Sequence, residues 1–460
     1  MANARRQQAV VIGGSMAGLL AARVLADFFE KVLIVERDVL PRGDEQRRGV
    51  PQGHHAHAIL SSGLQVTEEL FPGITAEMVT AGAPEADPAN DGTWFFEGAN
   101  LKRVSSATNS VISSRPFLES RVRRRVVELE NVVVWDTQSV QELLWDEGRV
   151  IGLSTERGRV VADLVVDASG RGSQVPKWLE ATGFRKPPEE KVEVDLVYTS
   201  RLFRRRDGDP KGDAFRVVAP TPEGKRGGVI LAQEGGRWIL TLYGYFGRRA
   251  PEDLDGFLDY AKSLPSRDLY DMVRDAEPIG PGQCFRFPAS TRRRYEMLKE
   301  FPAGLLVFGD ALCSFDPIFG QGMSSAALQA VALRRALRGK SKNVAKAFFA
   351  DAAKVVDGPW SIAVGSDLKM PETAGPRSAL VKFINWYMTR LHRAAHNDPI
   401  ATLAFIRVAQ LLDPPTAILR PKVAWRVLLG NIWRKGPTLQ TETKFDPLIS
   451  GQWASGKDRA

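Results

Sequence analysis

The sequence predicts an α/β fold with a second, separate β-sheet and a helical C-terminal region. Residues 9–36 follow the pattern strand, glycine turn, helix, strand, which is typical of a Rossmann-like βαβ unit. Residues 190–250 contain turn-separated strands outside this unit, namely VEVDLVYTSRLF, GGVILAQ and RWILTLYGYF. After about residue 340 the pattern is helical. These observations predict a Rossmann-like domain, an interleaved sheet domain and terminal helices.

Domain boundaries follow from the order of these segments. The chain has 460 residues, which exceeds the usual size of one hydrophobic core. We assign residues 1–190 and 279–375 to the Rossmann-like domain, with part of 73–115 joining the other sheet, and residues 191–278 to the sheet domain. A stretch with Pro and Gly near 371–376 predicts the hinge into a helical region, 376–460.

Composition is that of a packed globular protein, with 43% hydrophobic and 25% charged residues. Two cysteines, Cys284 and Cys313, are too few for a disulfide framework. Neither a signal peptide nor an apolar stretch of the roughly 20 residues that span a bilayer is evident, so we expect a cytoplasmic protein. The net charge of +9 is mostly scattered arginine, which argues against nucleic acid as a partner.

The first chemical signal is the turn Gly13-Gly14-Ser15-Met16-Ala17-Gly18, which follows an apolar strand and opens a helix. Gly13 permits a tight turn, Gly18 permits close packing of helix on strand, and the helix N-terminus offers N–H groups to a pyrophosphate. Ser15 replaces the usual second glycine with a small hydrogen-bond donor. Glu36 ends the next strand, where an acid binds ribose hydroxyls. This segment predicts a dinucleotide site.

The second signal is Gly309-Asp310 at the end of the strand LLVFGD, before CSFDPIFGQGM and a helix. An acid at the carboxyl end of a strand, beside a glycine-rich loop, can bind hydroxyl groups, and the following helix directs N–H groups at an anion. Because the two signals lie far apart in the chain, we expect one cofactor to be held at both ends.

With Asp167-Ala168-Ser169-Gly170 between them, these motifs resemble, in order, the three fingerprints of the FAD-dependent monooxygenases of the p-hydroxybenzoate hydroxylase fold. The resemblance covers about residues 8–340, and the middle motif is looser because two residues separate Asp167 from Gly170. It implies one FAD, reduced by NAD(P)H directly or through a partner flavin reductase. It further implies transfer of one oxygen atom from O₂ to an organic substrate through a C4a-hydroperoxyflavin.

Two segments refine the resemblance. RRGVPQGHHAH and SFDPIFGQGMSSAAL are more similar to bacterial olefin epoxidases of polyketide and terpenoid pathways than to phenol hydroxylases. Olefin epoxidation in secondary metabolism is therefore the first expectation. The alternatives are a phenol-type aromatic hydroxylase, an olefin reductase similar to geranylgeranyl reductases, and a flavin- or lipid-binding module without activity. A halogenase is disfavoured because W-x-W-x-I-P is absent and no lysine lies between Lys31 and Lys102.

The resemblance also implies positions for the cofactor. Ser15 and Gly18 would lie near the pyrophosphate, Glu36 on the adenosine ribose, and Asp310 on the ribityl chain. The implied cofactor-binding residues are Gly13, Ser15, Met16, Gly18, Glu36, Arg37, Arg48, Val50, Arg115, Val140, Asp167, Gly309, Asp310, Pro317, Gly320, Gly322 and Met323. We assign no catalytic acid or nucleophile, because a flavin carries the chemistry itself.

The predicted sheet is rich in aromatic residues, which indicates a sizeable apolar substrate. Strand alternation sends about half of these side chains to each face, so a place in the sheet core is an equal alternative for each. The substrate-binding residues we predict are Phe203, Tyr243, Tyr245 and Phe246.

Histidines do not indicate a metal site. His54, His55 and His57 share a loop without cysteines or a matching set of carboxylates, and His392 and His396 have no evident third ligand.

The C-terminal region contains one stretch with two interpretations. Phe383, Trp386, Tyr387 and Leu391 share helical spacing, and Arg390 and Arg393 lie nearby. The stretch is either a helix packed on the FAD domain or a basic amphipathic surface that touches an anionic membrane.

Overall fold

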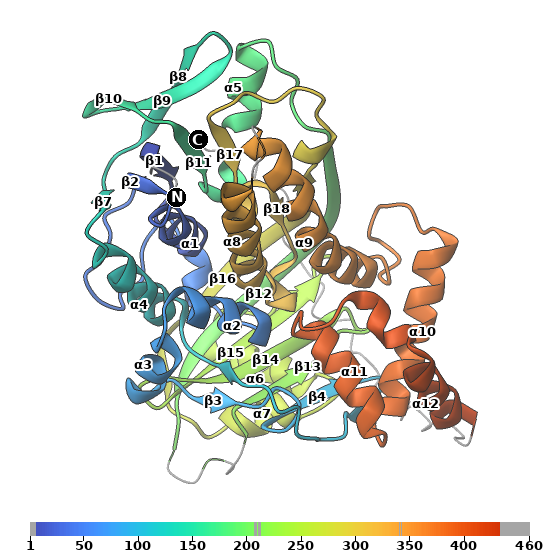
Figure 1. The fold of residues 1–460 in the computed structure, drawn as a ribbon. Helices are drawn as coiled ribbons and strands as arrows, with labels where there is room; N and C mark the ends of the chain where they lie inside the picture. The colour runs from blue at the N-terminus through green and yellow to red at the C-terminus, as the bar shows by residue number, and fades with distance from the viewer. Residues whose placement is uncertain (1–5, 207–208, 210–212, 340, 342, 433–460) are drawn as a thin grey trace, which may run out of the picture.

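The computed structural model describes residues 6–432 except 207–208, 210–212, 340 and 342. Two large sheets lie side by side, with a lobe of helices next to the second one (Figure 1). The first sheet has five parallel strands in the order β17-β11-β1-β2-β7, and the second has eight strands in the order β18-β16-β12-β15-β14-β13-β4-β5. The predicted fold class is confirmed.

The parallel sheet is assembled from distant parts of the chain. Its strands are β1 (Arg6–Ile12), β2 (Phe29–Val35), β7 (Val132–Trp135), β11 (Leu164–Asp167) and β17 (Leu305–Val307). Helices α1 (Met16–Leu25), α4 (Arg115–Val127) and α8 (Gly322–Arg338) pack around it. Strands covered on both faces read as continuous apolar runs, as the predicted segments did. Three strands of this sheet, β1, β11 and β17, lead into the three motifs, which therefore meet at one edge.

The eight-stranded sheet is mostly antiparallel. It contains β4 (Gly92–Phe96), β5 (Ala99–Asn100), β12 (Glu189–Arg204), β13 (Phe215–Val218), β14 (Arg226–Gln233), β15 (Arg237–Tyr245), β16 (Pro278–Arg293) and β18 (Cys313–Ser314). Strand β16 pairs with β12 along nearly its whole length. Residues 279–293 therefore extend this sheet, whereas the predicted boundary at residue 279 places them in the Rossmann-like domain. The glycines and prolines of PIGPGQCFRFPAS had hidden a strand pattern.

Smaller elements complete the two domains. A three-stranded sheet of β8 (Val140–Asp146), β9 (Arg149–Thr155) and β10 (Gly158–Val161) adjoins the parallel sheet, and α5 (Val175–Ala181) follows it. Helices α2 (Ser61–Leu70) and α3 (Ile74–Thr80), and the strand pair β3 (Glu85–Ala86) and β6 (Ser110–Val111), precede α4. Helices α6 (Leu254–Lys262) and α7 (Asp268–Val273) cover one face of the large sheet.

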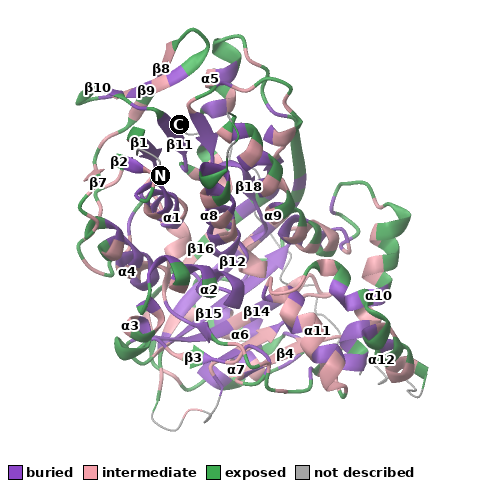
Figure 2. Ribbon diagram, in the orientation of Figure 1, coloured by how far each residue is buried: buried purple, intermediate pink, exposed green. Residues whose placement is uncertain are grey.

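The C-terminal part is helical over its described length. Helix α9 (Val344–Asp367) packs on α8, and α10 (Ala379–Ala395), α11 (Pro399–Ala409) and α12 (Pro421–Ile432) form the separate lobe; residues 433–460 of the predicted region lie outside the described residues. Both sheets are largely buried, whereas α10 has a broad exposed side (Figure 2). Among the described helices, none combines the length and the apolar character needed to cross a membrane.

Candidate functional site

The turn after β1 requires its glycines. Gly13 has a φ of +103°, and a Cβ atom at Gly18 would lie 1.8 Å from the carbonyl oxygen of Gly13. A Cβ atom at Gly13 would lie 2.7 Å from the carbonyl oxygen of Ala168, so the turn also packs against the middle motif. The two motifs are neighbours in space, as the predicted cofactor site requires.

The start of α1 offers a place for an anion. Ser15 precedes the helix without capping it; its hydroxyl donates to Glu119 Oε2 (2.8 Å) and accepts from Arg115 Nη2 (2.9 Å). The first helical hydrogen bond is donated by the N–H of Leu19, so the N–H groups of the first turn have no partner within the helix. Free N–H groups, the positive helix end and the Arg115 guanidinium fit a pyrophosphate.

Glu36 lies at the end of β2 beside this turn. Its Oε2 accepts from the Gly14 N–H (2.7 Å) and forms an ion pair with Arg47 (3.1 Å), and its Oε1 accepts from the Asp38 N–H (3.0 Å). Since each carboxylate oxygen has two acceptor positions, Oε1 can still accept from a ribose hydroxyl. This position agrees with the predicted ribose contact.

A buried ion network supports Glu36, and sequence reasoning missed it. Arg47 also contacts Glu119 (3.0 Å) and Asp38 (3.3 Å). Burial alone lowers the pKa of Arg47, but the carboxylates of Glu119, Glu36 and Asp38 outweigh it and raise the pKa overall. Burial by itself raises the pKa of Glu119, but the neighbouring charges of Arg115 and Arg47 outweigh burial, so the pKa of Glu119 is lowered overall. No motif marks Arg47, because only folding brings the loop to α4.

The other predicted contacts near the adenosine end remain predictions. Arg37 and Arg48 are exposed, whereas Val50 and Val140 are half-buried. Val140 begins β8, close in the chain to Gln138, whose N–H donates to the carbonyl of Glu36 (2.9 Å).

Asp167 of the middle motif serves the protein itself. It is buried at the end of β11, and its carboxylate accepts from the N–H of Ser169 (3.0 Å) and from the hydroxyl of Ser173. Burial raises its pKa, although these hydrogen bonds and Arg293 oppose the shift. In this structure Asp167 fixes the conformation of the loop from Ala168 to Ser173, against which Gly13 packs.

Asp310 is placed differently, in a turn of 3₁₀-helix, Gly309–Ala311, after β17. Among the described residues, none donates a hydrogen bond to its carboxylate, which is half-buried. Burial raises its pKa, against the charges of Arg171 and Arg115. A Cβ atom at Gly322 would lie 3.8 Å from the Oδ1 of Asp310. The N-terminus of α8, which contains Gly322 and Met323, is therefore adjacent to the Asp310 carboxylate. A half-buried acceptor without a donor fits a ribityl hydroxyl, and the site as a whole fits FAD.

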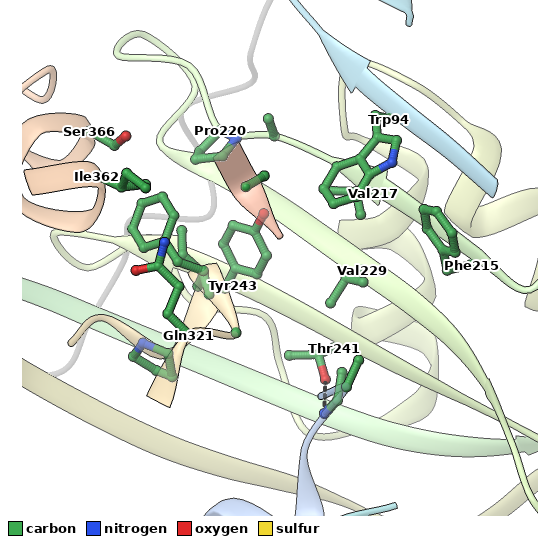
Figure 3. A pocket seen from close by; sticks show the side chains of 18 of the residues that line it. Trp94, Phe215, Val217, Pro220, Val229, Thr241, Tyr243, Gln321, Ile362 and Ser366 are labelled. Carbon is green, nitrogen blue, oxygen red and sulfur yellow. Dashed lines mark hydrogen bonds between the residues drawn. The ribbon is translucent and has the colours of Figure 1, made fainter. Parts of the chain in front are cut away.

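A cavity of about 340 Å³ lies between the large sheet and the C-terminal helices. One wall is the loop Pro317–Gln321, which follows the Asp310 motif and contains Gly320 with a φ of +65°. Figure 3 shows Tyr243 and Val229 of the sheet facing the same space as Gln321 and Ile362. Most of the lining is apolar or aromatic, including Trp94, Phe96, Phe215, Leu231, Met388 and Phe405.

The predicted substrate residues divide between the two faces of the sheet. Tyr243 and Tyr245 line the cavity; the Tyr243 hydroxyl donates to the Val218 carbonyl (3.2 Å) and the Tyr245 hydroxyl to Asp316 (2.9 Å). Phe203 does not line it: this side chain is fully buried on the opposite face, against Phe257. The prediction for Phe203 was therefore wrong.

Phe246 also lies outside the cavity lining. It follows β15 with a φ of +52°, is half-buried, and packs against the hydrophobic core that includes Tyr245 and the strands of the parallel sheet. The cavity-facing row of β15 is Thr241, Tyr243 and Tyr245. Neighbouring side chains on a strand point to opposite faces, so Phe246 is not part of this row.

Two of the three loop histidines, His55 and His57, line the cavity, whereas His54 is exposed. His55 lines the cavity and shares a hydrogen bond with Ser200 Oγ (2.7 Å) through Nδ1. Burial lowers the pKa of His55 to about 3 and that of His57 to about 4. Within the part of the chain that the structure describes, no three histidine, cysteine or acidic side chains could together hold a metal ion.

Comparisons with known proteins agree with this geometry. No model of a protein family matches the chain. Protein Rv3254 of Mycobacterium tuberculosis is 35% identical over 461 residues, covering 94% of this chain and 95% of Rv3254. Digeranylgeranylglycerophospholipid reductase 3 of Methanosphaera stadtmanae is 21% identical over 70% of this chain and 75% of that protein.

Solved structures share the fold. The flavin-dependent brominase Bmp2 superposes with a TM-score of 0.64 at 18% identity, covering 88% of this chain and 93% of Bmp2. PqsL of Pseudomonas aeruginosa, described as a probable FAD-dependent monooxygenase, superposes with a TM-score of 0.58 at 15% identity, covering 79% of this chain and 98% of PqsL. The chain therefore has the fold of flavin-dependent monooxygenases and belongs to the same protein family as Rv3254 of Mycobacterium tuberculosis.

Proposed function

We propose that this protein is an FAD-dependent monooxygenase that transfers one oxygen atom from O₂ to a sizeable apolar substrate, with olefin epoxidation as the reaction. One observation carries the proposal: the apolar cavity and the cofactor motif share the loop Pro317–Gln321 as a wall. A molecule in the cavity would thus lie next to the flavin end of the cofactor.

The residues at the parallel sheet have distinct tasks toward FAD. The first turn of α1, Ser15 and Arg115 would hold the pyrophosphate, Glu36 a ribose, and Asp310 the ribityl chain. The N–H groups that begin α8 would stabilise negative charge on the reduced ring. When bound and reduced, FAD would supply the electrons that activate O₂ for transfer of one oxygen atom. NAD(P)H, directly or through a flavin reductase, is the proposed reductant.

The cavity has the complementary task of placement. Its apolar lining excludes water and favours a lipophilic molecule, and a fixed orientation decides which π-bond of that molecule receives oxygen. Tyr245 contributes to this rigidity, because its hydroxyl is held by the buried carboxyl group of Asp316 (2.9 Å). An electron-rich ring could occupy the same place, so aromatic hydroxylation is the alternative within the monooxygenase class.

A second candidate function is reduction of an olefin. It is supported by the similarity to the digeranylgeranylglycerophospholipid reductase, at 21% identity. The two functions differ in their use of oxygen: a reductase saturates its substrate without O₂, whereas a monooxygenase consumes O₂ and leaves one oxygen atom in the product. Halogenation has no such support, because the likeness to a brominase is one of fold, and Lys31 and Lys102 enclose a stretch without lysine.

The first experiment measures FAD binding by fluorescence titration. Asp310→Ala should weaken binding, because each charge-assisted hydrogen bond contributes roughly 1.5–3 kcal/mol. Asp259→Ala, at an exposed site of α6, is the matched control and should bind as the wild type does. Equal affinities for all three proteins would remove Asp310 from the site, and a wild type without FAD affinity would refute the proposal.

The second experiment identifies the reaction. FAD-loaded protein, NAD(P)H and ¹⁸O₂ are incubated with an unconjugated lipophilic polyene or a phenol, with and without a flavin reductase, and products are analysed by mass spectrometry. An epoxide carrying one ¹⁸O atom is the expected product. A labelled phenol derivative without any epoxide would assign aromatic hydroxylation. A saturated product formed anaerobically would assign the reductase function.

A further inference from the structure

Two helices of the C-terminal lobe carry an exposed apolar stripe each. On α10 the stripe contains Trp386, which is 50% exposed, and on α12 it contains Trp425, which is 59% exposed. Of the thirteen exposed large hydrophobic side chains in the described residues, six lie on these two helices, including every aromatic one. We call these six the α10/α12 face: Leu380, Phe383, Trp386, Trp425, Leu428 and Ile432.

The spacing of the stripes is that of amphipathic helices. Phe383 and Trp386 stack with ring centroids 5.8 Å apart, one helical turn from each other. The side of α10 that packs on the lobe carries the buried residues His392 and Ala395. Trp425, Leu428 and Ile432 repeat at three and four residues along α12. Both helices thus pack on the lobe with one side and present large apolar groups on the other.

The charged residues on these two helices all have one sign. Neither α10 nor α12 contains an acidic residue, and together they contain Lys382, Arg390, Arg393, Lys422 and Arg426. The Arg390 guanidinium lies over the Trp386 ring, 3.8 Å from its centroid. Within the described chain, no carboxylate forms an ion pair with Lys382, Arg390 or Lys422. Arg393 pairs with Glu97 (3.7 Å) and Arg426 with Asp398 (3.4 Å). Aromatic groups bordered by cations are typical of helices that lie in a membrane interface.

The same lobe forms a wall of the substrate cavity. Asn385, Met388 and His392 of α10, and Phe405 of α11, line the cavity. Helix α10 therefore separates the exposed apolar face from the space that we assign to a lipophilic substrate.

Charge distinguishes the partners that could cover such a face. A second copy of the chain carries a net charge of +9. The segment 433–460 contains five basic and three acidic residues, so its net charge is also positive. A basic face repels both, whereas a bilayer with anionic phospholipids attracts it. We propose that the α10/α12 face docks the protein on an anionic phospholipid membrane, from which a lipophilic substrate reaches the cavity. The route of the substrate rests on the proposed function, but the docking does not.

The test is co-sedimentation of the full chain with vesicles of phosphatidylcholine alone or mixed with phosphatidylglycerol, at low and high salt. The wild type should bind the mixed vesicles at low salt and lose binding at high salt. A Phe383→Ser/Trp386→Ser variant and a Lys382→Glu/Arg390→Glu variant should each bind about ten-fold more weakly. Val161→Ser/Met297→Ser, which changes exposed apolar residues elsewhere, is the matched control and should bind as the wild type does.

Other outcomes overturn the proposal. A wild type that ignores the mixed vesicles, or a Phe383→Ser/Trp386→Ser variant that binds them fully, refutes membrane docking. So does a dimer in light scattering that this variant abolishes, since a second copy would then cover the face. FAD uptake and the melting temperature, measured on every variant, show that each is folded. Because no substrate is used, failure of this test leaves the monooxygenase proposal unaffected.

Discussion

His392 provides a quantitative test of the packing between the lobe and the large sheet. Its ring lies 4.3 Å from that of Phe96 and 4.7 Å from that of Phe405, measured between centroids. Among the described residues, neither ring nitrogen has a hydrogen-bond partner. Burial lowers the pKa of His392 to about 3, helped by the nearby charge of Lys369. The perturbation we choose is His392→Phe, which keeps an aromatic ring and removes the titration.

The size of the effect follows from proton linkage. The ordinary pKa of histidine is 6.5, so between pH 7 and pH 5 the unfolded chain takes up a proton at this site that the folded protein does not. Since the folded pKa is the lower one, the stabilisation is complete above pH 6.5 and is lost as the pH falls toward 3. From pH 7 to pH 5 the loss is about 2 kcal/mol. His55 and His57 act with the same sign, so the variant removes only part of the total.

The assay is equilibrium urea unfolding of wild type and variant at pH 7 and pH 5. The wild type should lose about 2 kcal/mol more than His392→Phe over this interval. Val161→Ser, at an exposed position without a titratable group, is the control and should lose as much as the wild type. An equal loss for wild type and His392→Phe would refute the argument, because His392 would then gain its proton as readily in the folded protein as in the unfolded chain.

Three further predictions follow from single contacts. Gly18→Ala should abolish tight FAD binding in a fluorescence titration, because the new Cβ would lie 1.8 Å from the Gly13 carbonyl oxygen; wild-type affinity would contradict the assignment of the turn. Phe203→Ala should lower the free energy of unfolding by about 3–5 kcal/mol in urea titrations without changing the affinity for a lipophilic ligand, since the side chain is buried away from the cavity. Burial raises the pKa of both Asp316 and Asp367, which contact each other, so the wild type loses stability as the pH rises above the usual range of a carboxyl group. Asp367→Asn should reduce this loss in thermal melts between pH 5 and pH 8, and an unchanged loss would show that the pair shares no proton.

Local patterns were sufficient for the parallel sheet and its motifs. The segment from β1 to β2 was predictable because its apolar runs, glycine turn and terminal Glu36 all lie within one short stretch. The position of Asp310 was predictable for the same reason. The network of Arg47 and Glu119 was not, because these residues lie 72 positions apart and meet only through the packing of α4.

Which side chains of the large sheet face the cavity depends on how its strands pair, and this pairing could not be predicted from local sequence patterns. Phe203 pairs with Trp238, and Tyr198 pairs with Tyr243. Because residues an odd number apart on one strand point to opposite faces, this register places Phe203 on the helix-covered face and Tyr243 on the cavity face. The alternation along β12 alone does not show which side chains face the cavity. The register between β12 and β15 shows that Phe203 and Tyr243 lie on opposite faces of the sheet.

The order of strands in the parallel sheet has a consequence for how the protein is made. Strand β11 lies between β1 and β17, so its outer edge has no partner until Leu305–Val307 has been synthesised. A ribosome that has produced the first half of the chain therefore presents a nascent sheet with an open edge, a feature prone to wrong pairing. Asp310 follows β17 directly, so this edge is closed just before the last residues of the proposed FAD site are synthesised. Supply of the cofactor during translation should accordingly raise the yield of folded protein, and a chain that ends before β17 should be retained by chaperones.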